Sequence, residues 1–108
     1  MLACVCLNPS FDRTVSLRSF TVGDMNRVLS ARQDVGGKGI NVAITARRLG
    51  IASCVLGCAG KNGIDAVRRK LDGEQVTHVF LPVDGDVRTN MKIVPQDGTA
   101  VTELNEPG

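Results

Sequence analysis

Three glycines and a lysine stand together in the run Gly36-Gly37-Lys38-Gly39, directly before a segment with helical spacing. Glycine lets the backbone approach a ligand closely and adopt positive φ angles. The start of a helix offers unpaired N–H groups and a partial positive charge. Together with the ammonium group of Lys38, this turn could bind a phosphate or several hydroxyls. A tight loop that binds nothing could have the same composition, so both interpretations stay open.

The glycine run matches neither of two common phosphate-binding motifs. G-x-G-x-x-G needs glycines at spacings that the run lacks, and G-x-x-x-x-G-K-[ST] fails because Lys38 is followed by Gly39. Asn41 falls in the first turn of the expected helix, where its amide could cap the helix or contact a ligand. Asp12 follows the first apolar run, near the carboxyl end of a predicted strand, where ligands bind in parallel sheets. A simple turn residue is the alternative for Asp12.

Positive charge is concentrated in the first half of the chain. The 108 residues carry 13 Lys and Arg against 11 Asp and Glu, a net charge of +2. Residues 1–50 hold seven basic and three acidic side chains, whereas residues 51–108 hold six and eight. Arg27 and Arg88 both fall in segments of alternating polar and apolar residues, where a single arginine is usually solvated. Neither arginine indicates a site by itself.

Two kinds of strand are expected to position these residues. Residues 2–7, 51–59 and 76–83 are apolar runs typical of strands buried in a parallel sheet, and residues 40–49 and 64–71 have helical spacing. Gly50 is expected to cap the first helix. Polar and apolar residues alternate over 13–17 and 27–33, and a hairpin over 88–94 and 99–104 turns at Gln96-Asp97-Gly98. The order predicts an α/β fold with a small antiparallel sheet beside a parallel one.

Composition excludes several classes of protein. No apolar run approaches the ~18 residues that a membrane span needs, and the first residues resemble a strand rather than a signal peptide. The small net charge and three aromatic residues, all Phe, argue against a nucleic-acid-binding surface. The four cysteines lie in or beside apolar runs, which predicts reduced buried thiols, a cytoplasmic protein and no metal site: Cys4, Cys6, Cys54 and Cys58.

Taken together, these residues resemble the N-terminal part of the PfkB (ribokinase-like) carbohydrate kinases. The similarity is strongest to the branch of 1-phosphofructokinases and tagatose-6-phosphate kinases. The segments that carry it extend over nearly the whole chain: Leu7-Asn8-Pro9-Ser10-Phe11-Asp12, Gly36-Gly37-Lys38-Gly39-Ile40-Asn41-Val42-Ala43, Arg88-Thr89-Asn90 and Thr102-Glu103-Leu104-Asn105-Glu106-Pro107-Gly108.

The resemblance implies a ribokinase-like α/β domain that is incomplete. The first part of its parallel core would be formed by residues of about 1–8 and 36–83. An antiparallel β-sheet lid over the sugar would be formed by residues of about 12–34 and 88–104. By position in the motifs, Asp12 would hold sugar hydroxyls. Lys38, Arg27 and Arg88 would surround the phosphate that the substrate already carries. The resemblance also assigns substrate contacts to Gly37, Gly39, Asn41 and Asn90.

The family's catalytic base is an Asp in a G-A-G-D motif, which these 108 residues do not contain. The resemblance therefore implies an ATP- and Mg²⁺-dependent kinase of a ketohexose monophosphate, of which this chain supplies the sugar-phosphate site but no catalytic residue. It also implies a homodimer formed through the lid sheet. A non-catalytic sugar-phosphate-binding module is the alternative. A dinucleotide-binding domain is a third hypothesis, although the glycine turn does not directly follow the first buried strand.

Overall fold

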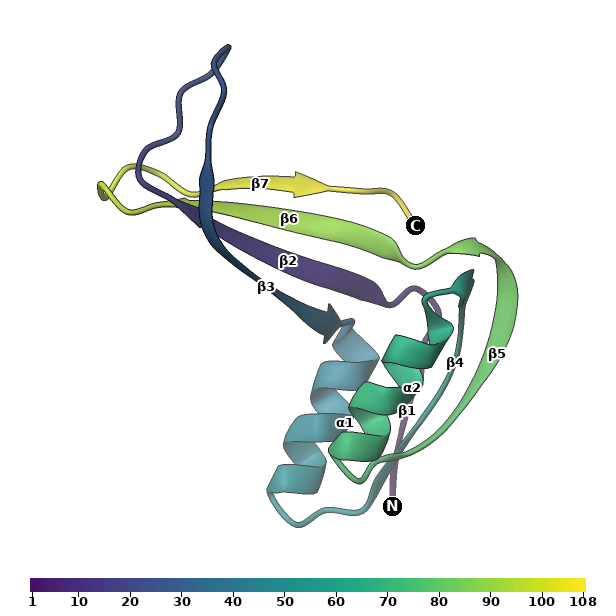
Figure 1. Ribbon diagram of the computed structural model, residues 1–108. Coiled ribbons are helices and arrows are strands. Elements are labelled where there is room, and N and C mark those ends of the chain that lie inside the picture. Colours follow the sequence, from purple (N-terminus) through teal and green to yellow (C-terminus); the bar gives the residue numbers. More distant parts are fainter.

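Two β-sheets and two helices make up the computed structural model, which describes residues 1–108 (Figure 1). One sheet and both helices form an α/β core, and the second sheet extends from the core as a lid. In chain order the elements are β1 (Leu2–Cys6), β2 (Ser10–Leu17), β3 (Val28–Gly36), α1 (Lys38–Arg48), β4 (Ser53–Asn62), α2 (Ile64–Gly73), β5 (Thr77–Asp86), β6 (Arg88–Pro95) and β7 (Thr102–Asn105).

The core sheet is parallel, with the strand order β1-β4-β5. Parallel neighbours need a connection across one face of the sheet, and α2 provides it between β4 and β5. Between β1 and β4 the chain first leaves the core to form β2 and β3, and α1 then brings it back. The predicted parallel core is confirmed, although β4 and β5 each run three residues beyond the predicted ends.

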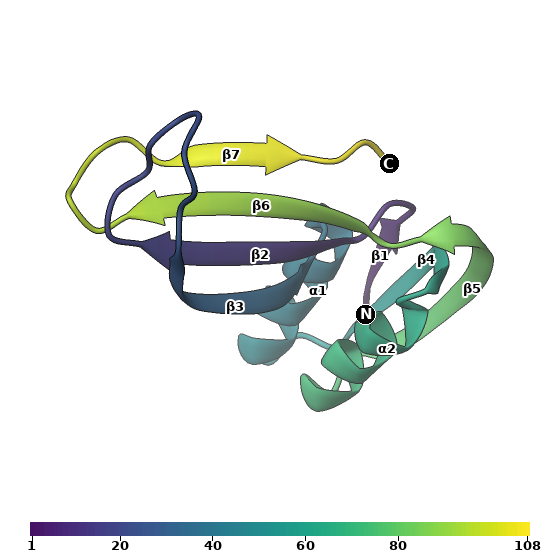
Figure 2. The ribbon, with the colours of Figure 1, turned by 45° about the horizontal axis from the view of Figure 1, so that its top comes forward.

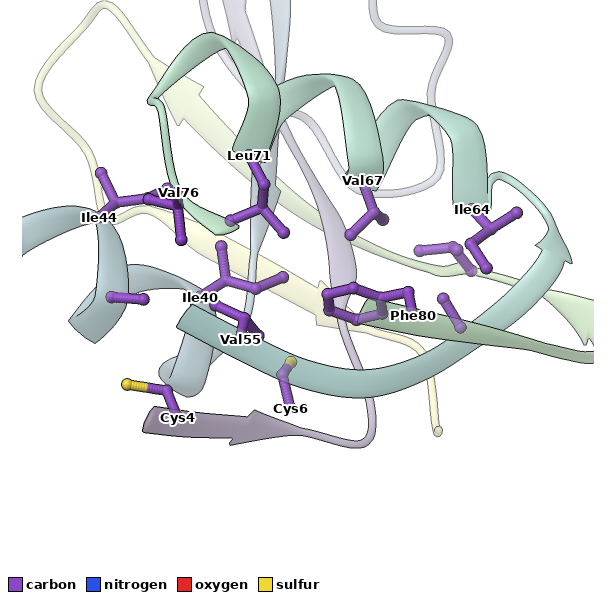
Figure 3. Close-up of a cluster of buried hydrophobic side chains, with 13 residues drawn as sticks. Cys4, Cys6, Ile40, Ile44, Val55, Ile64, Val67, Leu71, Val76 and Phe80 are labelled. Carbon is purple, nitrogen blue, oxygen red and sulfur yellow. The ribbon is translucent and has the colours of Figure 1, made fainter. Parts of the chain in front are cut away.

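Both helices pack against the same face of this sheet (Figure 3). Ile40 and Val67 are completely buried between helix and sheet, and Val55 is completely buried from the strand side. Cys4 and Cys6 also point into this cluster, as reduced thiols. The burial of apolar side chains here holds α1 and α2 to the sheet and so fixes where α1 begins.

The opposite face of the core sheet carries apolar side chains that no element of the chain covers. Val5, Leu56 and Val79 stand in register across the three strands, and they are 63%, 47% and 56% exposed. Leu81 extends the row along β5 and is 64% exposed. A parallel sheet is ordinarily covered on both faces, so an exposed apolar face of this kind is expected to favour association.

The lid is a four-stranded sheet of order β3-β2-β6-β7, and it corrects the predicted antiparallel sheet (Figure 2). The pairs β2–β3 and β6–β7 are antiparallel hairpins, but β2 and β6 are parallel. The reason is topological. Both strands leave the carboxyl edge of the core, β2 after β1 and β6 after β5, so they run in the same direction into the lid.

Both helices end in a turn whose last residue has a positive φ angle, and one of these ends was predicted from the sequence. Gly50, with φ of 85°, follows the last turn of α1, and the Gly50 and Ile51 N–H groups donate to the carbonyls of Arg47 and Ala46. This confirms the predicted glycine cap. At the end of α2 the same motif uses Gln75, whose φ of 58° is unusual for a residue with a side chain. The side chain of Arg47 donates to the Gln75 carbonyl at 3.3 Å, which couples the two helix ends.

Neither helix is long and apolar enough to cross a membrane.

We expect the uncovered core face to drive self-association of the 108-residue chain. Replacing Val79 and Leu81 together by Thr keeps β-strand propensity and removes apolar surface. Light scattering coupled to size exclusion should then show a larger monomer fraction. The control Val22→Thr changes a valine in the β2–β3 loop that is even more exposed, at 87%, but lies outside this face, and it should have no effect. A monodisperse wild-type monomer with a cooperative thermal melt would contradict this expectation.

Candidate functional site

Most of the predicted site residues lie at the base of the lid, where β2, β3 and β6 meet the core. Gly36, Ser10 and Arg88 form one row across these three strands, because Ser10 pairs with Gly36 on one side and with Arg88 on the other. Asp12 lies two residues further along β2 on the same face, directly opposite Asn90. The start of α1 at Lys38 follows Gly36 after one residue.

Asp12 is held by its neighbours on this face. The Ser10 hydroxyl donates to Asp12 Oδ1 at 2.8 Å, and the Asn90 side-chain amide donates to the same oxygen at 3.4 Å. The other carboxylate oxygen, Oδ2, lies over Gly36, and a Cβ atom at that position would overlap it. The carboxylate therefore occupies space that exists only because residue 36 is glycine.

Close packing also excludes a side chain at the other two glycines of the turn, Gly37 and Gly39. Gly37 has a φ of 138°, and a Cβ there would lie 2.9 Å from Cys6 Sγ. Burial raises the pKa of that Cys6 thiol, so the α1 start rests on a neutral side chain. A Cβ at Gly39 would overlap the Val5 carbonyl oxygen. The glycine run thus lets α1 pack closely against β1, and this packing role does not depend on whether the run also binds a ligand.

Arg88 is a half-buried cation without a carboxylate partner. Its guanidinium makes only two long contacts, at 3.5 Å, to the carbonyl oxygens of Asn8 and Glu106. Its Nε is buried and has no hydrogen-bond partner. Lys38 is exposed at the first position of α1, and it too is absent from all seven ion pairs of the chain. These two cations are free to interact with an anion.

Two of the predicted residues lie apart from this group. Arg27 is exposed and precedes Val28, which pairs with Leu17 at the far end of the lid. That row lies seven positions along β2 from Ser10, which is about 24 Å at the usual rise. Asn41 is exposed on the outer side of α1, beside Val42 and Thr45. The chain therefore brings Asp12, Asn90 and Arg88 to the end of the lid at which α1 begins, with Gly37, Lys38 and Gly39, but it does not bring Arg27 there.

Two hollows flank the site. One of about 380 Å³ lies on the polar face of the lid and is lined by Asp12 and Asn90 together with Thr14, Arg32 and Lys92 among others. A smaller one, of about 170 Å³, lies at the carboxyl ends of the core strands and is lined by Asn8, Cys58 and Arg88 among others. The first hollow is thus bordered by hydrogen-bond acceptors and by cations, of which Arg32 and Lys92 form ion pairs with Asp34 and Glu103. The unpaired guanidinium of Arg88 borders the second hollow.

Ser10 and Gly36 shape the surroundings of Asp12, and the sequence analysis gave neither of them a separate role. Ser10 stands inside the motif that pointed to Asp12, and the two-residue spacing on a strand would have put both side chains on one face. Gly36 was counted as part of the turn, although it is the last residue of β3. Its role follows from strand register, which the sequence does not specify directly.

The arrangement can bind a molecule with hydroxyls at one end and an anionic group at the other. A carboxylate accepts hydrogen bonds from hydroxyls, and a guanidinium or ammonium group binds phosphate with charge-assisted hydrogen bonds. No group of three His, Cys, Asp or Glu side chains in the chain could hold a metal ion.

Comparison with known proteins places the chain in a family. The model of the pfkB family carbohydrate kinases matches residues 6–106. The chain belongs to this family. The 1-phosphofructokinase of Bacillus subtilis is 38% identical over 108 residues, and that of Rhodobacter capsulatus is 36% identical over 107. The matches take in 100% and 99% of this chain, but 35% and 34% of those proteins.

A solved structure gives the same fold. The crystal structure of a putative phosphofructokinase from Staphylococcus aureus matches 100% of this chain and 34% of its own, with a TM-score of 0.88 and 32% sequence identity. The chain therefore corresponds to about a third of the length of its relatives, and its fold is a ribokinase-like α/β fragment with a mixed lid sheet.

We expect Gly39→Ala to destabilise the fold, because the added methyl group would meet backbone of β1. The cost should be about 1–3 kcal/mol, typical of forced overpacking. Gly73→Ala is the matched control, since a Cβ there meets nothing within 4 Å and alanine favours a helix. Chemical denaturation should show a lower midpoint for Gly39→Ala and an equal or higher one for Gly73→Ala. Equal midpoints for Gly39→Ala and wild type would contradict the close approach of α1 to β1.

Proposed function

We propose that this chain supplies the sugar-phosphate site of an ATP-dependent kinase that phosphorylates a ketohexose monophosphate. Conversion of fructose 1-phosphate to fructose 1,6-bisphosphate is the reaction we favour, and phosphorylation of tagatose 6-phosphate is second. The similarity to 1-phosphofructokinases over the whole chain supports this choice.

The observation that carries the proposal is the pairing of a free, half-buried cation with a fixed carboxylate. Arg88 stands beside Ser10 in the sheet, and Ser10 donates to Asp12. A monophosphate with a charge near −2 needs cations in a sheltered place, and Arg88 with Lys38 would provide them. Asp12 and Asn90 would bind hydroxyls of the sugar, with Gly37 and Gly39 at the helix start completing the contacts. Asn41, which is exposed on the outer side of α1, is left out of them.

Arg27 is left out of the contacts proposed for a single chain. Its place at the far end of the lid, about 24 Å from the Ser10 row at the usual strand rise, puts it beyond the reach of an arginine side chain. The sheltered position of Arg88 makes it the stronger phosphate ligand of the remaining cations.

ATP and Mg²⁺ are implied by membership of the family, and we assign no residue of this chain to either. In-line phosphoryl transfer needs a base for the attacking hydroxyl and groups that stabilise the transferring phosphoryl. The chain contains no G-A-G-D motif to supply them. We therefore propose that the 108 residues bind the sugar phosphate but do not turn it over by themselves.

A homodimer through the lid is part of the same proposal. The lid face opposite Asp12 carries a small apolar cluster of Val15, Leu17 and Ile93, with Met91 packed against it. Leu104, which pairs with Met91, is 56% exposed at the margin of this cluster. The cluster is buried within one chain, so a second lid could cover only the exposed margin at Leu104. The reduced thiols of Cys4 and Cys6 support the proposed cytoplasmic location.

We expect Lys38→Ala and Arg88→Ala each to weaken binding of fructose 1-phosphate to the chain. Each change removes a charged hydrogen bond, so the loss should be about 1.5–3 kcal/mol. Isothermal titration calorimetry measures it. Arg69→Ala is the control, because Arg69 is exposed on α2 and takes part in no ion pair. Unchanged affinity in both test variants would refute the phosphate contacts.

A further inference from the structure

The two oxygens of the Asp12 carboxylate are in different situations. Oδ1 accepts hydrogen bonds from the Ser10 hydroxyl at 2.8 Å and from the Asn90 amide at 3.4 Å. No side chain or backbone group of the protein donates to Oδ2, which lies over Gly36. Because Ser10 is 2% exposed, its hydroxyl has little access to water. Its hydrogen bond is therefore committed to Asp12.

The same contact fixes the orientation of the Asn90 amide. An ionised carboxylate can only accept hydrogen bonds, so the NH₂ group of Asn90 must face Asp12. The carbonyl oxygen Oδ1 of Asn90 then points away from Asp12, and it is buried without a hydrogen-bond partner. Buried polar atoms are nearly always paired in folded proteins, so this oxygen indicates a donor that the chain itself does not provide.

We propose that Ser10 is a positioning residue that holds Asp12 Oδ1 and thereby reserves two acceptors, Asp12 Oδ2 and Asn90 Oδ1, for a pair of substrate hydroxyls. Here the substrate is the sugar phosphate of the proposed function, on which this inference rests. Ser10 does not touch the substrate. It acts by restricting the side-chain rotation of Asp12, so that the carboxylate stays over Gly36.

The acceptor pair also decides which end of the substrate binds here. Neither acceptor can donate a hydrogen bond, and Asp34 stands directly beside Asp12 on β3. Arg13, Arg32 and Lys92 also line this hollow, and Arg32 and Lys92 form ion pairs with Asp34 and Glu103. At Asp12 and Asn90 themselves a phosphate would meet a carboxylate and an amide oxygen, whereas hydroxyl groups can donate to both. The phosphate is expected on the side of Arg88. The orientation of the sugar phosphate would then follow from acceptors that bind its hydroxyls and a cation that binds its phosphate.

The test compares two probes, fructose 1-phosphate and inorganic phosphate, on the 108-residue chain. Ser10→Ala removes the hydroxyl and adds no volume, so the fold should be retained. We expect fructose 1-phosphate to bind about 3- to 10-fold more weakly to this variant, as for loss of one hydrogen bond. Inorganic phosphate lacks the sugar hydroxyls and should bind with unchanged affinity. Ligand-observed NMR titration measures both dissociation constants.

Ser16→Ala is the matched control. Ser16 lies on the same strand and the same face as Ser10, but its hydroxyl oxygen accepts from Gln96, at the far end of the lid. We expect it to leave both dissociation constants unchanged.

Two results would overturn the inference. Equal affinity of wild type and Ser10→Ala for fructose 1-phosphate would show that Ser10 does not position Asp12. An equal loss for both probes would show that Ser10 has only a general structural role. A wild-type chain that binds inorganic phosphate but not fructose 1-phosphate would instead refute the proposed function, together with the substrate assumed here.

Discussion

The site depends on the close approach of the Asp12 carboxylate to Gly36, where only a residue without a side chain leaves enough room. The antiparallel pairing of β2 and β3 brings Ser10 opposite Gly36, and the absence of a Cβ there leaves room for the carboxylate. One residue later the chain enters α1. The same register therefore sets the position of the carboxylate and the start of the helix, and a shift by one residue would turn Asp12 to the other face of the lid.

The topology explains how residues far apart in sequence come together around Asp12. The chain leaves the carboxyl edge of the core twice, after β1 and after β5, and the two departing strands pair in parallel. That pairing places Asn90 opposite Asp12 and Arg88 opposite Ser10, although 78 residues separate each pair. The core anchors this base of the lid, since Phe11 and Val35 pack against the buried core cluster.

The sequence indicated much of this arrangement. Continuous apolar runs identified the three core strands, and the glycine run with its helical continuation identified the start of α1. The family motifs singled out Asp12, Lys38, Arg88 and Asn90. The parallel pairing of β2 with β6 was missed, because alternation of polar and apolar residues marks a strand but not the direction of its neighbour.

The sequence could not separate ligand-binding glycines from packing glycines. Gly39 is needed because the backbone of β1 lies against it, and Gly36 is needed because the Asp12 carboxylate lies over it. Both nevertheless stand in the same run of glycines. Arg27 shows the reverse problem. In the sequence it falls in the same kind of alternating segment as Arg88, but it precedes β3, and the register of the β2–β3 hairpin puts it at the far end of the lid.

Mapping of the bound sugar phosphate by two-dimensional ¹H–¹⁵N NMR tests the central claim most directly. Titration of the chain with fructose 1-phosphate should shift the backbone resonances around Asp12, Gly37 and Asn90 together, with a single dissociation constant, and should leave those of Arg27 and Val28 in place. Shifts confined to the far end of the lid or to the outer core face, with none around Asp12, would contradict the account.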